Sequence, residues 1–233
     1  LHKAIRRQRQ MCIRDRTFGL FAAGELTATD VSIIPADGLL EIVSVDENGH
    51  AVCKTDLPFG SYYVKERTTN GAYILSNQKY PVVFEYAGQE TALVQILVNE
   101  GGAVSNELLR GRVDGVKVGE NPEGGEDVTL AGALMGLFRP DTEEFTEENA
   151  LLTAVTGKDG SFSFENIPYG HWIVKEISAP DLYTVSPQQH HVYIGADGQH
   201  IEIRVENTLI RGSVQVTKTE AVEAVSYTHL TLP

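Results

Sequence analysis

The chain has 233 residues, of which 42% are hydrophobic and 22% charged, and its formal net charge at pH 7 is -13. This length allows one large domain or two ordinary ones, and the composition supports a packed core rather than a disordered chain. An acidic chain repels nucleic acid and anionic membranes, so we expect neither as a partner. No apolar run is long enough for a membrane span, and two cysteines cannot build a disulfide framework.

The two ends of the chain look foreign to the protein between them. Residues 11–15 read MCIRD, and residues 225–229 read VSYTH. One possible coding of the first pentapeptide has a reverse complement that encodes the second, so both can be one DNA element translated in opposite directions. That element resembles the adapter end left by transposase-based sequencing libraries. We therefore predict that residues 1–16 and 225–233 are adapter-derived, and we exclude them from the fold.

Residues 17–224 contain an internal repeat of about one hundred residues, the size of a small β-sandwich. Three matches occur in the same order in both copies: TFGLF with LMGLF from Thr17 and Leu134, DLPFGSYYVKE with NIPYGHWIVKE from Asp56 and Asn166, and VSNELLRG with VENTLIRG from Val104 and Val205. The order predicts a first repeat without its opening strand over 17–109, a complete second repeat over 110–210, and the opening strand of a third over 211–224. No Pro- or Ser-rich linker separates them, so we expect neighbouring repeats to stack closely.

Within each copy the hydrophobic period is two, which is typical of β-strands. Ile201, Ile203 and Val205 alternate with charged residues, as expected for a half-buried antiparallel strand, and Phe162 and Phe164 alternate with serine. No segment shows a helical period with caps, and turn signals separate the strand-like segments at 47–49, 158–160 and 196–198. We therefore predict an all-β fold of tandem Ig-like antiparallel β-sandwich domains.

Three polar side chains fall on the predicted core-facing side when the alternation of each strand is extended by one step. They are an amide, a carboxyl and an amine: Asn207, Glu176 and Lys117. The incomplete copies repeat the pattern at Asn106, Glu66 and Lys218. Burying such groups unpaired costs several kcal/mol each, so they either contact one another or lie at exposed strand ends. Exposure is the simpler interpretation for one residue alone, whereas the recurrence of all three favours a contact.

The segment WIVKEISAPDLY, residues 172–183, carries a family resemblance, together with the turn LAGA at 130–133. It resembles the collagen-adhesin B-type (Cna-B) domains, also called SpaA-like or prealbumin-like domains, of Gram-positive surface proteins and pilins, although Trp172 replaces the usual tyrosine. The resemblance covers nearly all of 17–224. Many domains of this family form a spontaneous isopeptide bond between a first-strand lysine and a last-strand asparagine, assisted by a glutamate.

By position, the resemblance assigns the cross-link to Lys117 and Asn207 and the assisting role to Glu176. The chemistry is reasonable, because burial disfavours the charged forms of both an amine and a carboxyl. A neutral Lys117 would attack the side-chain carbonyl of Asn207, while a protonated Glu176 polarises that carbonyl and shuttles protons as ammonia leaves. The reaction occurs once, so the resemblance implies neither a turnover enzyme nor a cofactor.

The other two sites are incomplete. Glu66 and Asn106 lack an opening-strand lysine, and Lys218 lacks a partner domain. Asn99 is an alternative acceptor to Asn106, because the second half of the first repeat is longer than that of the second. We leave this choice open at the level of the sequence.

Other polar residues do not predict a metal site or a nucleophile. His190 and His191 are adjacent on a predicted strand and so point to opposite faces, and no ligand set joins them to His200. The acidic segment 140–149 lacks the spacing of an EF-hand and is predicted to be a solvated loop. Cys53 has no base near it in the sequence, so we interpret it as a packed or exposed thiol.

The resemblance implies a stalk segment of an extracellular, cell-wall-associated protein or adhesin, whose partners are neighbouring repeats of the same chain. A host matrix protein or glycan is a further candidate partner if the sandwich is itself a binding module, which a contiguous exposed aromatic patch would favour. An enzyme of transthyretin-like fold would need a convergent cluster of His and Arg residues. The sequence shows no such cluster, and fold resemblance alone does not support an activity.

Overall fold

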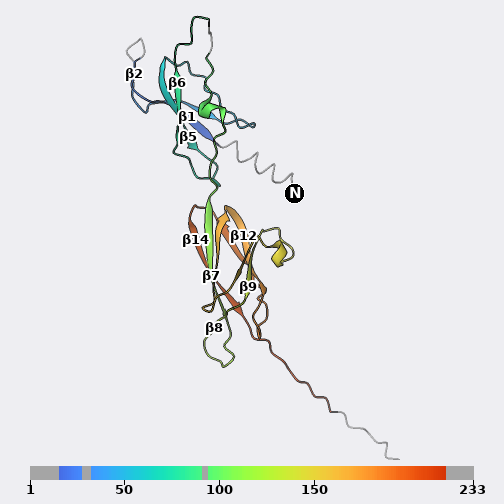
Figure 1. Ribbon diagram of the computed structural model, residues 1–233. Helices are drawn as coiled ribbons and strands as arrows, with labels where there is room; N and C mark the ends of the chain where they lie inside the picture. The colour runs from blue at the N-terminus through green and yellow to red at the C-terminus, as the bar shows by residue number, and fades with distance from the viewer. Residues whose placement is uncertain (1–15, 28–32, 91–93, 219–233) are drawn as a thin grey trace, which may run out of the picture.

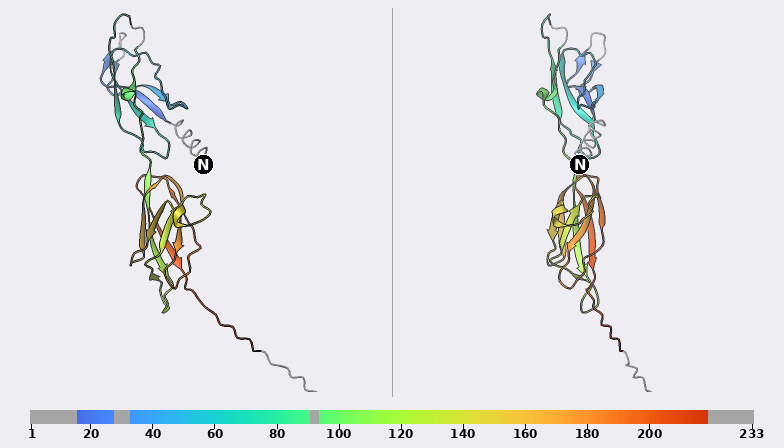
Figure 2. Two further views of the ribbon diagram at one scale, coloured as in Figure 1. Left: turned by 45° about the vertical axis from the view of Figure 1, so that its right-hand side comes forward. Right: turned by 90° about the vertical axis from the view of Figure 1, so that its right-hand side faces the viewer.

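The computed structural model describes residues 16–27, 33–90 and 94–218, and it places two β-rich units end to end along an elongated molecule (Figures 1 and 2). The described residues form strands and two short 3₁₀ helices, which confirms the all-β prediction. None of the helices in these ranges is long and apolar enough to cross a bilayer. Of the predicted adapter-derived segments 1–16 and 225–233, all but Arg16 lie outside the described residues, as do residues 219–224 of the predicted third repeat.

The second unit is a sandwich of two sheets over residues 110–207. One sheet has the strand order β10-β9-β12-β13 and the other β11-β7-β14, with β8 paired to β7. The elements are β7 (Arg110–Gly119), β8 (Val128–Thr129), β9 (Leu134–Phe138), η2 (Glu147–Asn149), β10 (Leu152–Val155), β11 (Ser161–Pro168), β12 (Gly170–Ser178), β13 (His190–Ile194) and β14 (Gln199–Asn207).

Apolar side chains of both sheets meet in the core of this unit. Val113 and Phe164 come from one sheet, and Met135 and Trp172 come from the other. Burying an aliphatic or aromatic side chain of this size contributes about 1.5–3 kcal/mol, so the facing sheets hold each other in place. The predicted alternation along β14 is confirmed, since every second residue from residue 201 to Val205 faces the core.

The direction of β14 differs from the prediction. We expected an antiparallel strand, but β14 pairs in parallel with β7, with Val205 opposite Lys117 and Asn207 opposite Gly119. The hydrophobic period of two is common to both pairings, so the pattern does not report strand direction. As a result, the first and last strands of the unit run side by side in the same direction and end at the same edge of the sheet.

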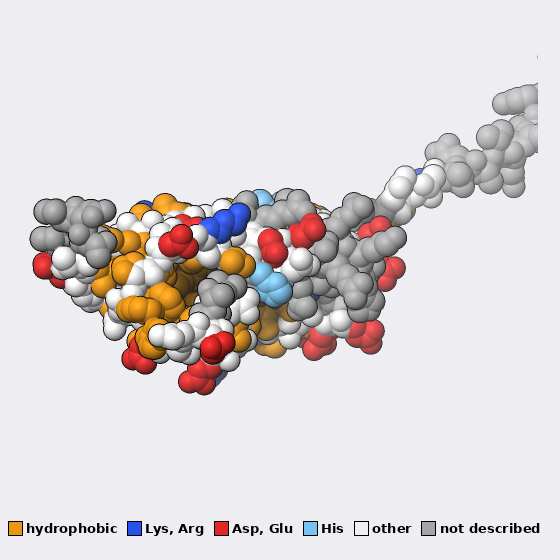
Figure 3. All heavy atoms as spheres, turned by 90° about the horizontal axis from the view of Figure 1, so that it is seen from above, with side chains coloured by type: hydrophobic (Ala, Val, Ile, Leu, Met, Phe, Trp, Pro, Cys, Tyr) orange, Lys and Arg blue, Asp and Glu red, His pale blue; other side chains and the backbone are white. Residues whose placement is uncertain are grey.

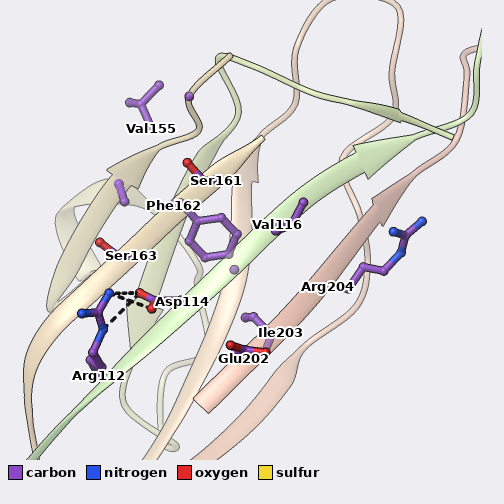
Figure 4. Close-up of a pocket in the computed structure, with 13 residues that line it drawn as sticks. Arg112, Asp114, Val116, Val155, Ser161, Phe162, Ser163, Glu202, Ile203 and Arg204 are labelled. Carbon is purple, nitrogen blue, oxygen red and sulfur yellow. Dashed lines mark hydrogen bonds and ion pairs between the residues drawn. The ribbon is translucent and has the colours of Figure 1, made fainter. Parts of the chain in front are cut away.

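Gly115 leaves room on β7 for an aromatic ring from the neighbouring strand. Phe162 of β11 is directly opposite Gly115, and its ring lies against β7 (Figure 4). A Cβ atom at Gly115 would come within 2.1 Å of that ring. Arg112 and Asp114, which alternate with the core-facing residues of β7, form an ion pair at 2.6 Å. Glycine at position 115 is therefore required by packing.

Replacing Gly115 with valine is expected to destabilise the second unit by about 1–3 kcal/mol, because an overpacked core forces side chains or backbone to shift. The same substitution in a Phe162→Ala background is expected to be tolerated, since the ring is gone. Denaturant unfolding followed by the fluorescence of Trp172, the single tryptophan of the chain, measures both effects. Gly212→Val is the control, because nothing lies within 4 Å of a Cβ there. Equal destabilisation with and without the ring would contradict this explanation.

The described part of the first unit contains one four-stranded sheet, in the order β4-β1-β5-β6, and a separate pair of short strands, β2-β3. The elements are β1 (Thr17–Ala22), β2 (Leu26–Thr27), β3 (Ile33–Ile34), β4 (Leu39–Ser44), β5 (Gly60–Thr68), β6 (Lys79–Phe84) and η1 (Val98–Gly101). Residues 50–58 and 94–106 correspond to β11 and β14 but form no β-strand. In the second unit both of those strands pair with β7, and the described first unit has no counterpart of β7.

Two leucines join the units without a spacer. Leu108 forms a β-bridge with Tyr73 of the first unit. The backbone N–H of Leu109 donates to the carbonyl of Ala72, and the Leu109 carbonyl accepts from the N–H of Tyr169 in the second unit, both at 2.9 Å. β7 begins at the next residue, so the last pairing of one unit leads directly into the first strand of the next.

Candidate functional site

The three polar residues predicted to face the core of the second unit come together there. Lys117 lies on β7, Glu176 on β12 of the facing sheet, and Asn207 at the end of β14. All three are buried, and the side chains of Lys117 and Glu176 are 0% exposed. The period of two along each strand brings them inward, and the parallel pairing of β7 and β14 places Lys117 and Asn207 near the same edge.

Each of these three side chains contacts the other two. Lys117 Nζ donates a hydrogen bond to Asn207 Oδ1 and lies 3.5 Å from Glu176 Oε1. Asn207 Nδ2 donates to the same carboxylate oxygen at 2.9 Å. We expected Glu176 to polarise the amide carbonyl and to shuttle protons, and this geometry places its carboxyl beside the amide nitrogen and the amine. A carboxyl in that position can exchange protons with both nitrogen atoms.

Ser186 contributes a contact that the sequence analysis missed. Its backbone N–H donates to Glu176 Oε2 at 2.7 Å, so both oxygens of the buried carboxyl have a donor. Ser76 makes the equivalent contact with Glu66 Oε2 at 3.1 Å in the first unit. Each serine follows its glutamate by ten positions. This shared spacing is the sequence signal that could have identified the contact.

Burial sets the electrostatics of the site. Desolvation lowers the pKa of Lys117 from its ordinary value of 10.5, and the nearby carboxyl of Glu176 opposes that shift. His190, at the start of β13, has a buried Nε2 atom without a hydrogen-bond partner. Desolvation lowers the pKa of His190 as well, and the charge of Lys117 adds to the effect. The surroundings therefore favour the neutral amine of Lys117, which is its nucleophilic form.

The first unit contains two of the three groups. Glu66 is buried, and Asn106 Nδ2 donates to its Oε2 atom at 2.7 Å. Asn99 lies elsewhere, with its Nδ2 atom donating to the carbonyl of Ala103. The geometry thus pairs Asn106, and not Asn99, with the glutamate. The remaining oxygens, Glu66 Oε1 and Asn106 Oδ1, are buried without a hydrogen-bond partner.

Residues 211–218, predicted to open a third repeat, form no strand and are exposed, including Lys218. Within the described residues they have no sheet to join. No hydrogen bond or ion pair joins Lys218 to an asparagine or a glutamate among the residues that the structure describes.

Apart from His190, the residues considered as metal ligands or nucleophiles lie away from the buried polar site. His200 Nε2 pairs with Asp114 at 2.6 Å on the surface of the second unit. The described ranges contain no group of three or more His, Cys, Asp or Glu side chains that could hold a metal ion. Cys53 is half-buried, and desolvation raises the pKa of its thiol. The acidic segment 140–149 is mostly exposed, as predicted for a solvated loop.

Comparisons with known proteins agree with this fold. Residues 117–209 match the SpaA family, described as a prealbumin-like fold domain. No curated protein matches the chain. The Bacillus anthracis TIE protein is similar in structure, with 19% sequence identity and a TM-score of 0.55, over 85% of this chain and 31% of that one. The chain therefore spans about a third of the length of that protein.

Two pilus proteins also appear among the similar structures. GBS52, the minor pilin of Streptococcus agalactiae, has 14% identity and a TM-score of 0.39, over 88% of this chain and 87% of that one. The C-terminal fragment of the pilus adhesin SpaC from Lactobacillus rhamnosus GG has 11% identity and a TM-score of 0.43, over 87% and 92%. The family match over residues 117–209 shows that the second unit is a SpaA prealbumin-like domain.

Proposed function

We propose that the chain is a stalk segment of an extracellular, cell-wall-associated protein of Gram-positive type, and that its second unit forms an isopeptide bond between Lys117 and Asn207. The observation that carries the proposal is the buried contact of the lysine amine with the asparagine amide, beside the Glu176 carboxyl. The SpaA match and the end-to-end arrangement of the units support a rod at the cell surface. Neighbouring repeats of the same chain are then its structural partners.

The bond would form by exchange of one amine for another on the Asn207 side chain. A proton passes from Lys117 to Glu176, which leaves both groups neutral in the buried site. Lys117 Nζ attacks Asn207 Cγ, and the new N–C bond replaces the bond from Cγ to Nδ2. Glu176 then gives a proton to Nδ2 and takes one from Nζ, so it ends as the neutral acid with the one proton that the ammonium group supplied, while Nδ2 leaves as ammonia. The reaction occurs once per molecule, so the domain is not a turnover enzyme.

The position of the bond suits a protein under tension. Force applied to the chain enters this unit at the start of β7 and leaves it after Asn207. A covalent link from Lys117 to Asn207 carries that force directly from the first strand to the last. The residues between them, which include most of the sandwich, would then bear no load. A bond of this kind is also unaffected by reducing agents.

The mass of the full chain under denaturing conditions tests the proposal. A cross-linked monomer is expected to be lighter than calculated by one ammonia, and its proteolytic digest is expected to contain a branched peptide joining Lys117 to Asn207. Lys117→Met and Glu176→Ala should both restore the calculated mass. Lys158→Met is the matched control, since Lys158 lies on an exposed turn and should leave the mass deficit unchanged. An unmodified mass for the wild-type chain would refute the bond.

A second candidate function is direct contact with a host protein or glycan, and an aromatic group on the first unit favours it. Phe59 lies 5.0 Å from Phe84 and 6.1 Å from Tyr86 between ring centroids, and Phe59 and Tyr86 are exposed. Exposed aromatic patches commonly mark interaction sites. Saturable binding of a matrix protein or glycan that Phe59→Ser abolishes would favour this function, whereas binding insensitive to Phe59→Ser would exclude this patch.

A further inference from the structure

A buried polar atom of the second unit has no hydrogen-bond partner. It is the Nε2 atom of His190, the first residue of β13. An unsatisfied buried atom of this kind costs about 1–3 kcal/mol, so its presence in a folded core needs an explanation. The reaction proposed above gives this side chain no role.

The course of β13 places His190 beside the buried lysine, glutamate and asparagine. The residues that follow it in phase along β13 are buried in the core, so His190 faces the core as well. Val174 of β12 is opposite it, and Glu176 lies two residues further along the same face. A short turn joins β13 to β14, so the start of β13 and the end of β14, where Asn207 lies, are at the same end of the sandwich.

The charge of Lys117 acts on this imidazole. Desolvation lowers the pKa of His190 from its ordinary value of 6.5, and the charge of Lys117 lowers it further. Of the neighbouring strands, β12 contributes the carboxyl of Glu176 to the same face, and β14 contributes the uncharged amide of Asn207. Glu206 is exposed, and its charge acts on Lys117. His190 is therefore neutral at pH 7, and one nitrogen of a neutral imidazole can accept a proton.

The proposed bond requires Lys117 to lose two protons. The ammonium group loses both when its nitrogen becomes an amide, and the ammonia that leaves Asn207 carries away only one of them. Glu176 is the proton acceptor in hydrogen-bond contact with the amide, and its two oxygens already accept from Asn207 Nδ2 and from the backbone N–H of Ser186. A carboxyl that holds the first proton can accept the second only after it has given the first away. A separate acceptor for the first proton would remove this restriction.

We propose that His190 Nε2 takes the first proton from Lys117 Nζ and that the ring releases a proton to solvent from its other nitrogen. This inference rests on the proposed function and changes one step of it, because Glu176 now stays ionised. Nζ attacks Asn207 Cγ, Glu176 moves the second proton from Nζ to Nδ2, and Nδ2 leaves as ammonia. One N–C bond forms, one breaks, and the remaining proton is released at the surface.

His190 reaches the surface as well as the site. The residue is half-buried although its Nε2 atom is enclosed, so another part of it is exposed. It lies on β13, an edge strand of its sheet. The formal net charge of the chain is -13, and acidic side chains are spread over the face seen in Figure 3. A negatively charged surface attracts the proton that leaves.

The rate at which the full chain loses ammonia tests the role of His190. Chains from a short cell-free synthesis are diluted into buffers from about pH 5 to about pH 9, denatured at set times and weighed by mass spectrometry. We expect His190→Ala to form the bond about 100-fold more slowly than the wild type at pH 7, as is usual for the loss of a positioned proton acceptor. The difference should shrink at high pH, because burial lowers the pKa of Lys117 and its amine then loses the proton unaided.

The pH profile of the wild type should identify the imidazole. Its rate should fall as the pH drops through the pKa of His190, which lies below 6.5, because the imidazolium cannot accept a proton. His190→Ala should lack this fall. Free imidazole in the buffer should restore part of the rate of His190→Ala, since it can occupy the vacated space, and a role in packing alone would not respond in this way.

His191→Ala is the matched control, because His191 is the next residue, is exposed and points to the opposite face of β13. It should react at the wild-type rate, and all three chains should share the fluorescence of Trp172. A His190→Ala chain that reacts as fast as the wild type, or one that imidazole does not accelerate, would overturn the role of His190 and leave the Lys117–Asn207 bond in place. A wild-type chain that never becomes lighter would instead refute the bond itself.

Discussion

Replacing Lys117 with methionine is expected to lower the free energy of unfolding of the second unit by about 4–5 kcal/mol. The proposed bond would join residues 90 positions apart, and closing a loop of that length removes about this much conformational entropy from the unfolded chain, by analogy with disulfides. Methionine fills much of the volume of the lysine side chain and buries no charge, so the loss should reflect mainly the missing cross-link. Guanidinium unfolding followed by Trp172 fluorescence measures it, because that tryptophan belongs to the core of this unit.

Lys158→Met is the control for this measurement, since it removes a lysine from an exposed turn. Its unfolding curve should coincide with that of the wild type. If the mass shows that the wild type is cross-linked and yet Lys117→Met unfolds at the same denaturant concentration, the entropic explanation of the stability is wrong.

Replacing Glu176 with alanine is expected to be more damaging than replacing Lys117. The variant loses the cross-link and also leaves a fully buried amine without its carboxyl partner, at 3.5 Å in the wild type. Removing one partner of a buried ion pair costs about 3–5 kcal/mol, because the other charge remains uncompensated. The N–H of Ser186 and the amide of Asn207 lose an acceptor as well. Denaturant unfolding of Glu176→Ala beside Lys117→Met measures the difference.

The double variant Lys117→Met/Glu176→Ala separates charge from packing. It removes the buried amine, so it should be more stable than Glu176→Ala alone. A double variant that is no more stable than Glu176→Ala would show that the unpaired charge is not the cause.

The stability of Glu176→Ala should also depend on pH in a defined direction. Burial lowers the pKa of Lys117 in the folded state below the ordinary value of 10.5. Between those two pKa values the unfolded chain binds more protons than the folded one, so stability rises as the pH increases toward 10.5. The double variant lacks the amine and should not show this rise.

Much of the candidate site follows from the sequence alone. The period of two along each strand determines which side chains face the core, because successive residues of a strand point to opposite faces. That rule places Lys117, Glu176 and Asn207 inside, and the recurrence of the same residue types at Glu66, Asn106 and Lys218 favours a contact over exposed strand ends. The internal repeat likewise predicts which segments of the two units correspond, before any coordinates are considered.

Only the tertiary structure decided how these elements meet. An alternation of apolar and polar residues does not reveal whether a strand pairs in parallel or antiparallel. The parallel pairing of β14 with β7 nevertheless brings Lys117 and Asn207 to the same edge of the sheet. Ser186 acts through its backbone N–H, which every residue except proline possesses, so its residue type does not reveal the contact. The choice of Asn106 over Asn99 depends on which loop carries the extra residues, and a loop's path is set by packing against the sheet.

The strands of the first unit also depend both on the local sequence and on contacts between distant segments. Its sequence matches the second unit in the outer strands, but strand formation needs a partner, because backbone hydrogen bonds in a sheet lie between strands. Among the described residues, no central strand lies beside 50–58 and 94–106, and these segments do not form β-strands. The alternation of apolar and polar residues therefore determined which residues can form the sandwich. Whether both of its sheets form depended on a partner strand that is distant in the sequence.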